Sequence, residues 1–222
     1  MFQSVDTLVE AKVLRMQSAR NQINLHGRRD QIPVIDNYEL IRGHWRNFVE
    51  TARVISYSVE VPDKDGMDLY LASDSCNPQK CQNSSDVEAK IRNKVTVSGW
   101  CDMKKCLEDV MAHVKASGTK PAGIDIFTDG IWDPERKPEV EDVIHESIDL
   151  LIEKNAKPAN LMFQFIQFGR DPGGSKRLKF LDDGCKRTHR GVEYDIVDTK
   201  HCDDHVPKII IGSISSHNDN KD

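Results

Sequence analysis

Short apolar segments of strand length alternate with amphipathic segments of helix length through the second half of the sequence. Residues 123–128 and 161–168 are mostly apolar, and the segment after each repeats apolar side chains every three or four positions. Parallel strands need connections of this length, and such crossovers are almost always right-handed. The alternation predicts a doubly wound α/β fold, a three-layer arrangement with a mostly parallel central sheet and helices on both faces.

The same patterns predict where the elements lie. We expect strands at residues 32–36, 66–72, 123–128, 161–168 and 193–197. We expect helices from about Trp45 to Val59, at 102–116 and 140–152, through Leu178 and Leu181, and at 206–216. Residues 73–93 are polar and predict a loop. The predicted organisation is an N-terminal helical extension (1–30), one α/β domain (31–217) and a polar tail (218–222).

Charge and hydropathy restrict the partners and the location. The 222 residues carry 31 basic and 36 acidic side chains, a net charge of −5, which argues against a nucleic-acid-binding protein. No stretch approaches the roughly 18 consecutive apolar residues of a membrane span. The first 16 residues contain Asp6 and Glu10 and no apolar signal core. We therefore expect a cytoplasmic protein that binds neither nucleic acid nor membrane.

Four aspartates fall near the ends of predicted strands: Asp36, Asp74, Asp129 and Asp171. In doubly wound folds ligands bind beyond the carboxyl ends of the parallel strands, here called the C-terminal edge of the sheet. The sequence thus predicts an acidic C-terminal edge.

Nucleotide-binding motifs are absent or incomplete. No Gly-x-Gly-x-x-Gly occurs, and residues 169–176 only approximate a phosphate-binding loop. In that segment Ser175 precedes Lys176, whereas the motif needs the lysine directly after the last glycine. We interpret the segment as a Pro-Gly turn that begins a helix.

Potential metal ligands form only weak patterns. His201 and His205 are four residues apart, beside Cys202, Asp203 and Asp204, but Pro207 follows and the spacing fixes no third ligand. A solvated polar turn is the favoured interpretation. The cysteine pairs have four residues between them and are too widely spaced for a typical zinc knuckle (Cys76 with Cys81, Cys101 with Cys106).

Several collinear segments resemble the von Willebrand factor A-like domain, most closely the single-domain form found in filamentous fungi. They cover most of residues 32–217, and the most specific are Thr128-Asp129-Gly130 and the Phe-Gly-x-Asp-Pro turn at 168–172. The other segments are residues 34–45, 61–71, 98–110, 123–133 and 194–204.

The resemblance implies a metal-ion-dependent adhesion site, in which Asp-x-Ser-x-Ser, a Thr and an Asp hold Mg²⁺ through oxygen atoms. The first Asp matches Asp36 and the last Asp matches Asp129. The three hydroxyl positions match Tyr38, Leu40 and Cys101, none of which is a good magnesium ligand. We therefore expect a degenerate site with no metal or other cofactor, and leave open weak binding of magnesium or manganese.

Two functions remain. The first, which the resemblance favours, is a non-catalytic module that binds another protein. Its contact residues would lie around Asp36, Leu40, Cys101 and Asp129, with the aromatic side chains of Tyr38, Trp100 and Trp132 either as anchors or packed under the loops. The alternative is an enzyme that uses the emptied site, with Cys101 and Tyr38 as nucleophile or acid–base groups beside Asp36 and Asp129.

Overall fold

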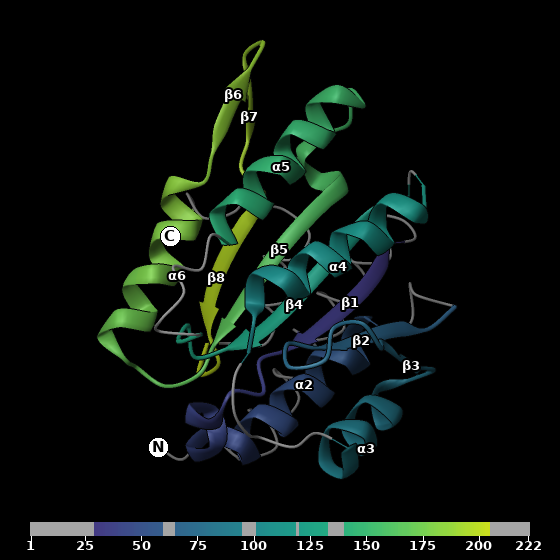
Figure 1. Cartoon of the computed structure of the whole chain (residues 1–222), viewed down its shortest axis with the longest axis vertical. Coiled ribbons are helices and arrows are strands. Elements are labelled where there is room, and N and C mark those ends of the chain that lie inside the picture. Colours follow the sequence, from purple (N-terminus) through teal and green to yellow (C-terminus); the bar gives the residue numbers. More distant parts are fainter. Residues whose placement is uncertain (1–28, 60–64, 95–100, 119, 133–139, 205–222) are drawn as a thin grey trace, which may run out of the picture.

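The computed structural model describes residues 29–59, 65–94, 101–118, 120–132 and 140–204. Its centre is a six-stranded sheet with the order β3-β2-β1-β4-β5-β8 (Figure 1). Five of these strands are parallel, and β3 pairs antiparallel with β2. The predicted doubly wound α/β fold is confirmed. The strands are β1 (Asp30–Ile35), β2 (Met67–Leu71), β3 (Gln79–Cys81), β4 (Ala122–Thr128), β5 (Leu161–Gln167) and β8 (Val197–His201).

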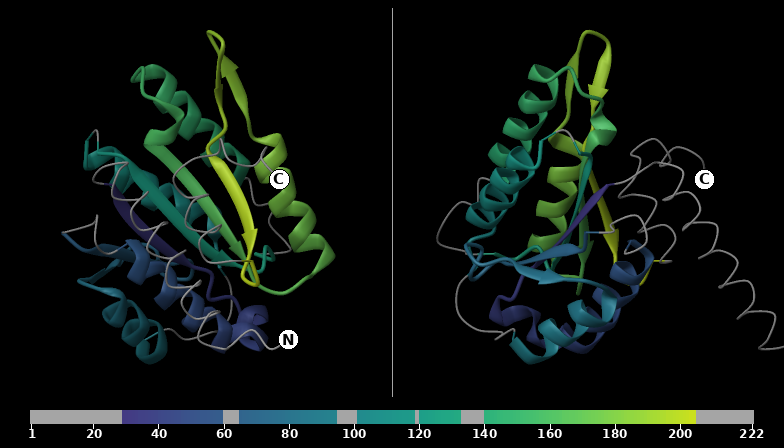
Figure 2. Two further views of the ribbon diagram at one scale, coloured as in Figure 1. Left: turned by 180° about the vertical axis from the view of Figure 1, so that it is seen from behind. Right: turned by 90° about the vertical axis from the view of Figure 1, so that its right-hand side faces the viewer.

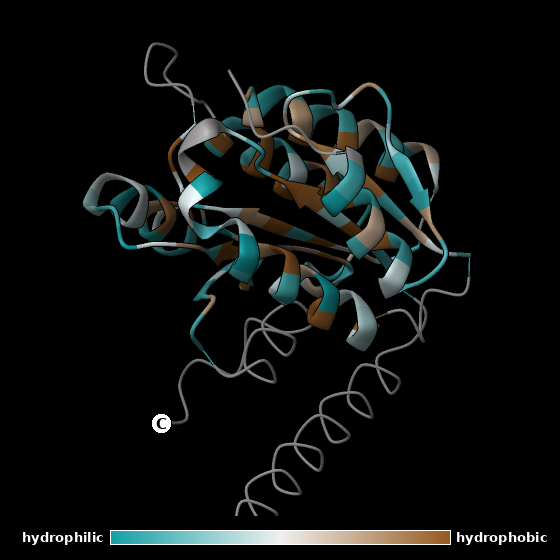
Figure 3. Cartoon of the chain, turned by 90° about the horizontal axis from the view of Figure 1, so that it is seen from below, coloured by the Kyte–Doolittle hydropathy of each residue, from teal (hydrophilic) through white to brown (hydrophobic). Residues whose placement is uncertain are grey.

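The central strands are buried on both faces, which explains why most of their side chains are apolar. Every residue of β4 and β5 is buried. One hydrophobic cluster lies between the sheet and the helices α4, α5 and α6, and a second lies between the sheet and α2 with α3. The two views of Figure 2 and the hydropathy colouring of Figure 3 show the apolar sheet between these layers.

The helices begin and end close to the predicted positions. A 3₁₀ helix, η1 (Glu39–His44), leads directly into α2, and η2 (Pro158–Asn160) precedes β5. The α-helices are α2 (Trp45–Val59), α3 (Ser84–Lys94), α4 (Met103–Ala116), α5 (Val140–Glu153) and α6 (Pro172–Gly184). No helix in the described part of the chain is long and apolar enough to cross a membrane.

The predicted loop at residues 73–93 is wrong in part, because it contains β3 and most of α3. Helix α3 is mostly polar. Among its apolar residues, Val87 and Ile91 are buried against the second cluster. The Asn83 side chain accepts a hydrogen bond from the Asp86 backbone N–H at 3.0 Å at the start of the helix. Two apolar positions in eleven residues are too few to give a helical pattern in the sequence.

The predicted strand at residues 193–197 is also wrong in part. This segment straddles the end of a hairpin, β6 (Arg187–His189) with β7 (Val192–Tyr194), and the first residue of β8. Figure 1 shows the hairpin projecting beyond the sheet. Strand β8 contains the polar residues Asp198, Lys200 and His201. A search of the sequence for apolar runs therefore does not detect this outermost strand.

Most of the N-terminal extension, the helix expected at residues 206–216 and the polar tail lie outside the described residues. Within the expected extension, Asp30 already belongs to β1.

Candidate functional site

The register of the parallel strands brings distant residues together at the C-terminal edge. Ile35 of β1 pairs with Phe127 of β4, and Gln167 of β5 pairs with both Thr128 and His201. Asp36 and Asp129 directly follow β1 and β4, so that they begin neighbouring loops. The acidic pair predicted from the sequence therefore lies at one edge of adjacent strands.

Asp36 is fully buried and hydrogen-bonded within the protein. Its Oδ2 accepts a hydrogen bond from Thr128 Oγ1 at 2.5 Å, and its Oδ1 accepts one from the Tyr38 backbone N–H at 3.2 Å. Burial, together with a smaller contribution from the nearby Asp129 carboxylate, raises the pKa of Asp36 to about 7, although these hydrogen bonds oppose the shift. The Asp36 carboxyl group thus holds its proton more tightly than an exposed aspartate does.

The loop after β4 places a second carboxylate beside the first. Asp129 is 5% exposed, and its Oδ1 accepts a hydrogen bond from the Ile131 backbone N–H at 2.8 Å. The Thr128 hydroxyl also accepts one from the Gly130 backbone N–H at 2.9 Å. Burial raises the pKa of Asp129 as well. Asp129 Oδ1 and the Thr128 hydroxyl are therefore both hydrogen-bonded within the loop after β4.

An asparagine next to Asp36 ties three segments together. Asn37 Nδ2 donates to Ser73 Oγ at 2.6 Å, and Asn37 Oδ1 accepts from the Ser73 backbone N–H at 3.1 Å. The Cys101 thiol also lies 3.5 Å from Asn37 Oδ1, in donor geometry. The loops after β1 and β2 and the start of α4 are thereby joined.

Cys101 immediately precedes the N-cap of α4. The Asp102 side chain caps the helix by accepting from the Lys105 backbone N–H at 2.9 Å. The Cys101 side chain is 1% exposed. Burial raises the pKa of the Cys101 thiol far above its usual range, and the neighbouring Asp36 raises it further. The thiol therefore keeps its proton at neutral pH.

Helix α6 packs closely against the loop that carries Asp129. Gly174, in the first turn of α6, lies against the Asp129 carbonyl, and Gly130 adopts a φ of +79°. Arg177 donates through Nη1 to the Gly130 carbonyl at 2.8 Å, and its guanidinium lies 5.2 Å from the ring centroid of Trp132. The first turn of α6 therefore determines the position of the Asp129 loop.

The interpretation of residues 169–176 as a helix-starting turn agrees with the start of α6. Asp171 caps this helix by accepting from the Gly173 and Gly174 backbone N–H groups at 2.8 and 2.9 Å. Its carboxylate therefore occupies donors that a phosphate would need.

The structure brings together four of the residues singled out in the sequence, Asp36, Tyr38, Cys101 and Asp129. Tyr38 is half-buried and packs against the first hydrophobic cluster. Leu40 lies in η1, and Trp100 and His205 lie outside the described residues. Trp132 is 1% exposed and contacts Phe165, so the expectation of an exposed anchor is wrong for this residue and the packing alternative holds.

Sequence reasoning missed three residues that hold this site together: Asn37, Ser73 and Thr128. Their hydrogen bonds join segments 36 to 92 positions apart in the chain. The only signal available was position, because each of the three follows or ends a predicted strand.

Comparisons with known proteins agree with the fold. No protein-family model and no curated protein sequence matches the chain. Among solved structures, the chain is similar to the manganese-loaded TRAP protein of Plasmodium vivax, with a TM-score of 0.53, 13% identity, and coverage of 86% of this chain and 74% of that one. A type V pilus tip protein, Mfa5 of Porphyromonas gingivalis, also matches at 13% identity, but with a TM-score of 0.36 over 56% of this chain and 26% of that one. The similarity to TRAP supports a von Willebrand factor A-like fold.

Proposed function

We propose that this protein is a non-catalytic, von Willebrand factor A-type module that binds another protein through its C-terminal edge without an intervening metal ion. The observation that carries the proposal is the internal hydrogen bonding of the site. Asp36 is bonded to Thr128, Asn37 to Ser73, and Asp129 to its own loop. These contacts give the edge a defined shape with no ion.

The donor set does not fit the magnesium or manganese ion that the fold family implies. Aligned with the family pattern, the hydroxyl positions are a phenol at Tyr38, an aliphatic side chain at Leu40 and a thiol at Cys101. Mg²⁺ requires near-octahedral coordination by oxygen atoms. The Cys101 thiol is buried against Asn37, and the Thr128 hydroxyl donates to Asp36.

The burial of Cys101 argues against the alternative enzyme function. A nucleophilic cysteine needs a thiolate, and thiolates form where positive charge or helix N–H groups stabilise them. Here Asp36 adds negative charge beside Cys101, and burial acts in the same direction on its pKa. The Asp102 carboxylate also occupies the Lys105 N–H in the first turn of α4.

Exposed carboxylates surround the buried site and indicate a partner with basic side chains. Asp74, Asp102 and Asp171 are all exposed at the C-terminal edge. An ion that captured acidic groups would favour an acidic partner, whereas this rim favours lysine and arginine. Trp132 is buried beneath the loops and cannot contact a partner, so we expect the rim of Asp74, Asp102 and Asp171 to bind through polar contacts.

Site-specific photocrosslinking in extracts of the source organism tests this function. A photoreactive side chain at Asp74 or Arg170, both exposed at the C-terminal edge, should capture the same protein with and without a chelator of divalent ions. Added salt should reduce the yield because the rim charges are exposed. The captured segment should be rich in lysine or arginine.

Matched positions at the opposite edge provide the control. Lys154 and Lys157 are exposed beyond α5, at the end of the sheet where β5 begins, and should not capture this protein. Capture that disappears with the chelator, or that occurs equally from Lys154, would refute a metal-independent contact at the C-terminal edge.

A further inference from the structure

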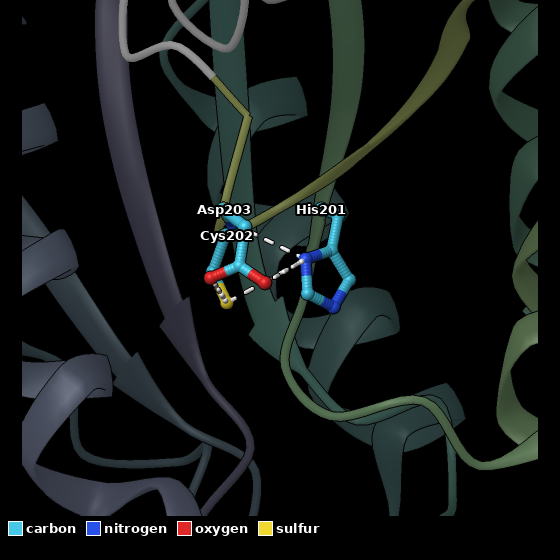
Figure 4. Close-up of side chains that lie close together, drawn as sticks. All are labelled: His201, Cys202 and Asp203. Carbon is cyan, nitrogen blue, oxygen red and sulfur yellow. Dashed lines mark hydrogen bonds and ion pairs between the residues drawn. The ribbon is translucent and has the colours of Figure 1, made fainter.

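A turn at the end of β8 gathers three side chains of different chemistry, well away from Asp36. His201 ends β8, and Cys202 and Asp203 follow in the turn. Their potential ligand atoms (a ring nitrogen, the sulfur and a carboxylate oxygen) all lie within 4.8 Å of one another. Figure 4 shows the imidazole, thiol and carboxylate pointing toward one another.

The backbone of this turn is fixed by its own hydrogen bonds. The Cys202 backbone N–H donates to the Gln167 carbonyl at 2.9 Å, which continues the pairing of β8 with β5. The Asp204 N–H donates to the His201 carbonyl at 2.9 Å, and Asp204 Oδ2 accepts from the His201 N–H at 2.8 Å. The backbone that carries the three side chains is therefore held in place without a bound ligand, which lowers the entropic cost of binding one.

The Nδ1 atom of the His201 imidazole faces Cys202 and Asp203. Its Nε2 lies 2.9 Å from the carbonyl oxygen of Gly169, which can only accept a hydrogen bond. The proton is therefore on Nε2, and Nδ1 carries the free electron pair, which accepts a long contact of 3.2 Å from the Asp203 N–H. Metal-bound histidines typically donate their second ring N–H to a carbonyl or carboxylate in this way.

The potential ligand atoms lie at or slightly beyond the spacing found around a small transition-metal ion. Nδ1 of His201 lies 3.3 Å from Oδ2 of Asp203 and 3.9 Å from the Cys202 sulfur, and that sulfur lies 4.0 Å from Oδ1 of Asp203. Zinc bonds of about 2.0–2.3 Å at tetrahedral angles separate neighbouring ligand atoms by roughly 3.3–3.6 Å. Small side-chain rotations would close the difference.

We propose that His201, Cys202 and Asp203 bind a zinc ion, with water as the fourth ligand. The combination of nitrogen, sulfur and oxygen donors suits zinc, whereas magnesium requires oxygen atoms. The Asp203 side chain is 66% exposed, which gives an ion access and leaves room for the water. The ion pair of Asp203 with Arg170, at 3.5 Å, is exposed and is lost at little cost.

This site is distinct from the metal position of the fold family. Asp36 follows β1, and β8 lies three strands away in the order β1-β4-β5-β8. Strands are spaced about 4.8 Å apart, so the two positions are separated by roughly 14 Å. The zinc proposal therefore does not depend on the proposed function.

The test is metal titration of the full-length, reduced protein. Zinc in competition with a chromophoric chelator should bind one ion per chain, and cobalt should give the absorption of a tetrahedral ion with a thiolate charge-transfer band. Cys202→Ser should abolish this band, and Cys202→Ser and His201→Gln should each weaken zinc binding by at least about 100-fold. Thermal melting without metal identifies any variant that fails to fold.

Two control variants complete the design. Cys76→Ser removes an exposed thiol outside the cluster, and Asp129→Ala alters the family's metal position. Both should bind zinc and cobalt as the wild type does. Unchanged zinc affinity in Cys202→Ser, or cobalt binding without a charge-transfer band, would overturn the proposal while leaving the interaction function unaffected.

Discussion

Gly174→Ala is expected to destabilise the protein by crowding the backbone of the Asp129 loop. An added Cβ would overlap the carbonyl oxygen of Asp129 and lie 3.3 Å from the Ile131 side chain. The neighbour is backbone and cannot rotate away, so either α6 or the Asp129 loop must move. Overpacking of this kind costs typically 1–3 kcal/mol. At about 2–4 °C per kcal/mol for a chain of this size, we expect the melting temperature to fall by roughly 2–12 °C.

Gly43→Ala is the matched control for this prediction. Gly43 lies in η1 at the same edge, and an added Cβ would meet no atom within 4 Å. Its melting temperature should stay within about 2 °C of the wild type, because surface substitutions usually change stability by less than about 0.5 kcal/mol. Equal melting temperatures for the two variants would show that α6 does not pack against the Asp129 loop as described.

The Asp36 carboxyl should lower the stability of the protein as pH rises from about 4 to 7, and Asp36→Asn should remove this contribution. Burial raises the pKa of Asp36 to about 7, above its ordinary value of 3.8. Below about pH 4 both folded and unfolded chains hold the proton. Between pH 4 and 7 only the folded chain holds it, so each pH unit costs up to about 1.4 kcal/mol of stability. Above pH 7 both chains are ionised and the loss is complete.

Chemical denaturation at pH 5 and pH 8 measures this effect. The asparagine amide cannot ionise. The unfolding free energy of Asp36→Asn minus that of the wild type should therefore be larger at pH 8 than at pH 5. Asp183→Asn replaces an exposed carboxylate on α6 and should follow the wild-type curve. Parallel pH curves for Asp36→Asn and the wild type would mean that Asp36 is already ionised in the folded protein at pH 5.

The elements that could be predicted are those whose burial is visible in the sequence as a high content of apolar residues. Strands β4 and β5 are mostly apolar because helices cover both faces of the sheet there. Helix α3 and strand β8 lie at the margins, where one face is polar and the periodic signal is weak. Their existence depends on contacts with β3 and β5 that no local pattern records.

The candidate site could be predicted only in outline. Asp36 and Asp129 follow strands, and parallel pairing brings such residues to one edge. Which group bonds to Asp36 could not be predicted, because Thr128 lies 92 positions away and many hydroxyls are available. The burial of Trp132 likewise depends on Arg177 and Phe165, which reach it from α6 and β5. The cluster at His201 forms in a turn, and the spacing of residues in the sequence does not show in which direction their side chains point.

The most direct test of the central claim is the melting temperature of the protein in millimolar Mg²⁺ or Mn²⁺, compared with a chelator. An ion that binds only the folded state at 100 times its dissociation constant would add about 2.7 kcal/mol, or roughly 5–10 °C. Because Tyr38, Leu40 and Cys101 stand at the hydroxyl positions of the family pattern, we expect no shift above about 1 °C. A rise of several degrees in the wild type that Asp129→Ala abolishes would contradict the account and restore a metal-dependent adhesion site.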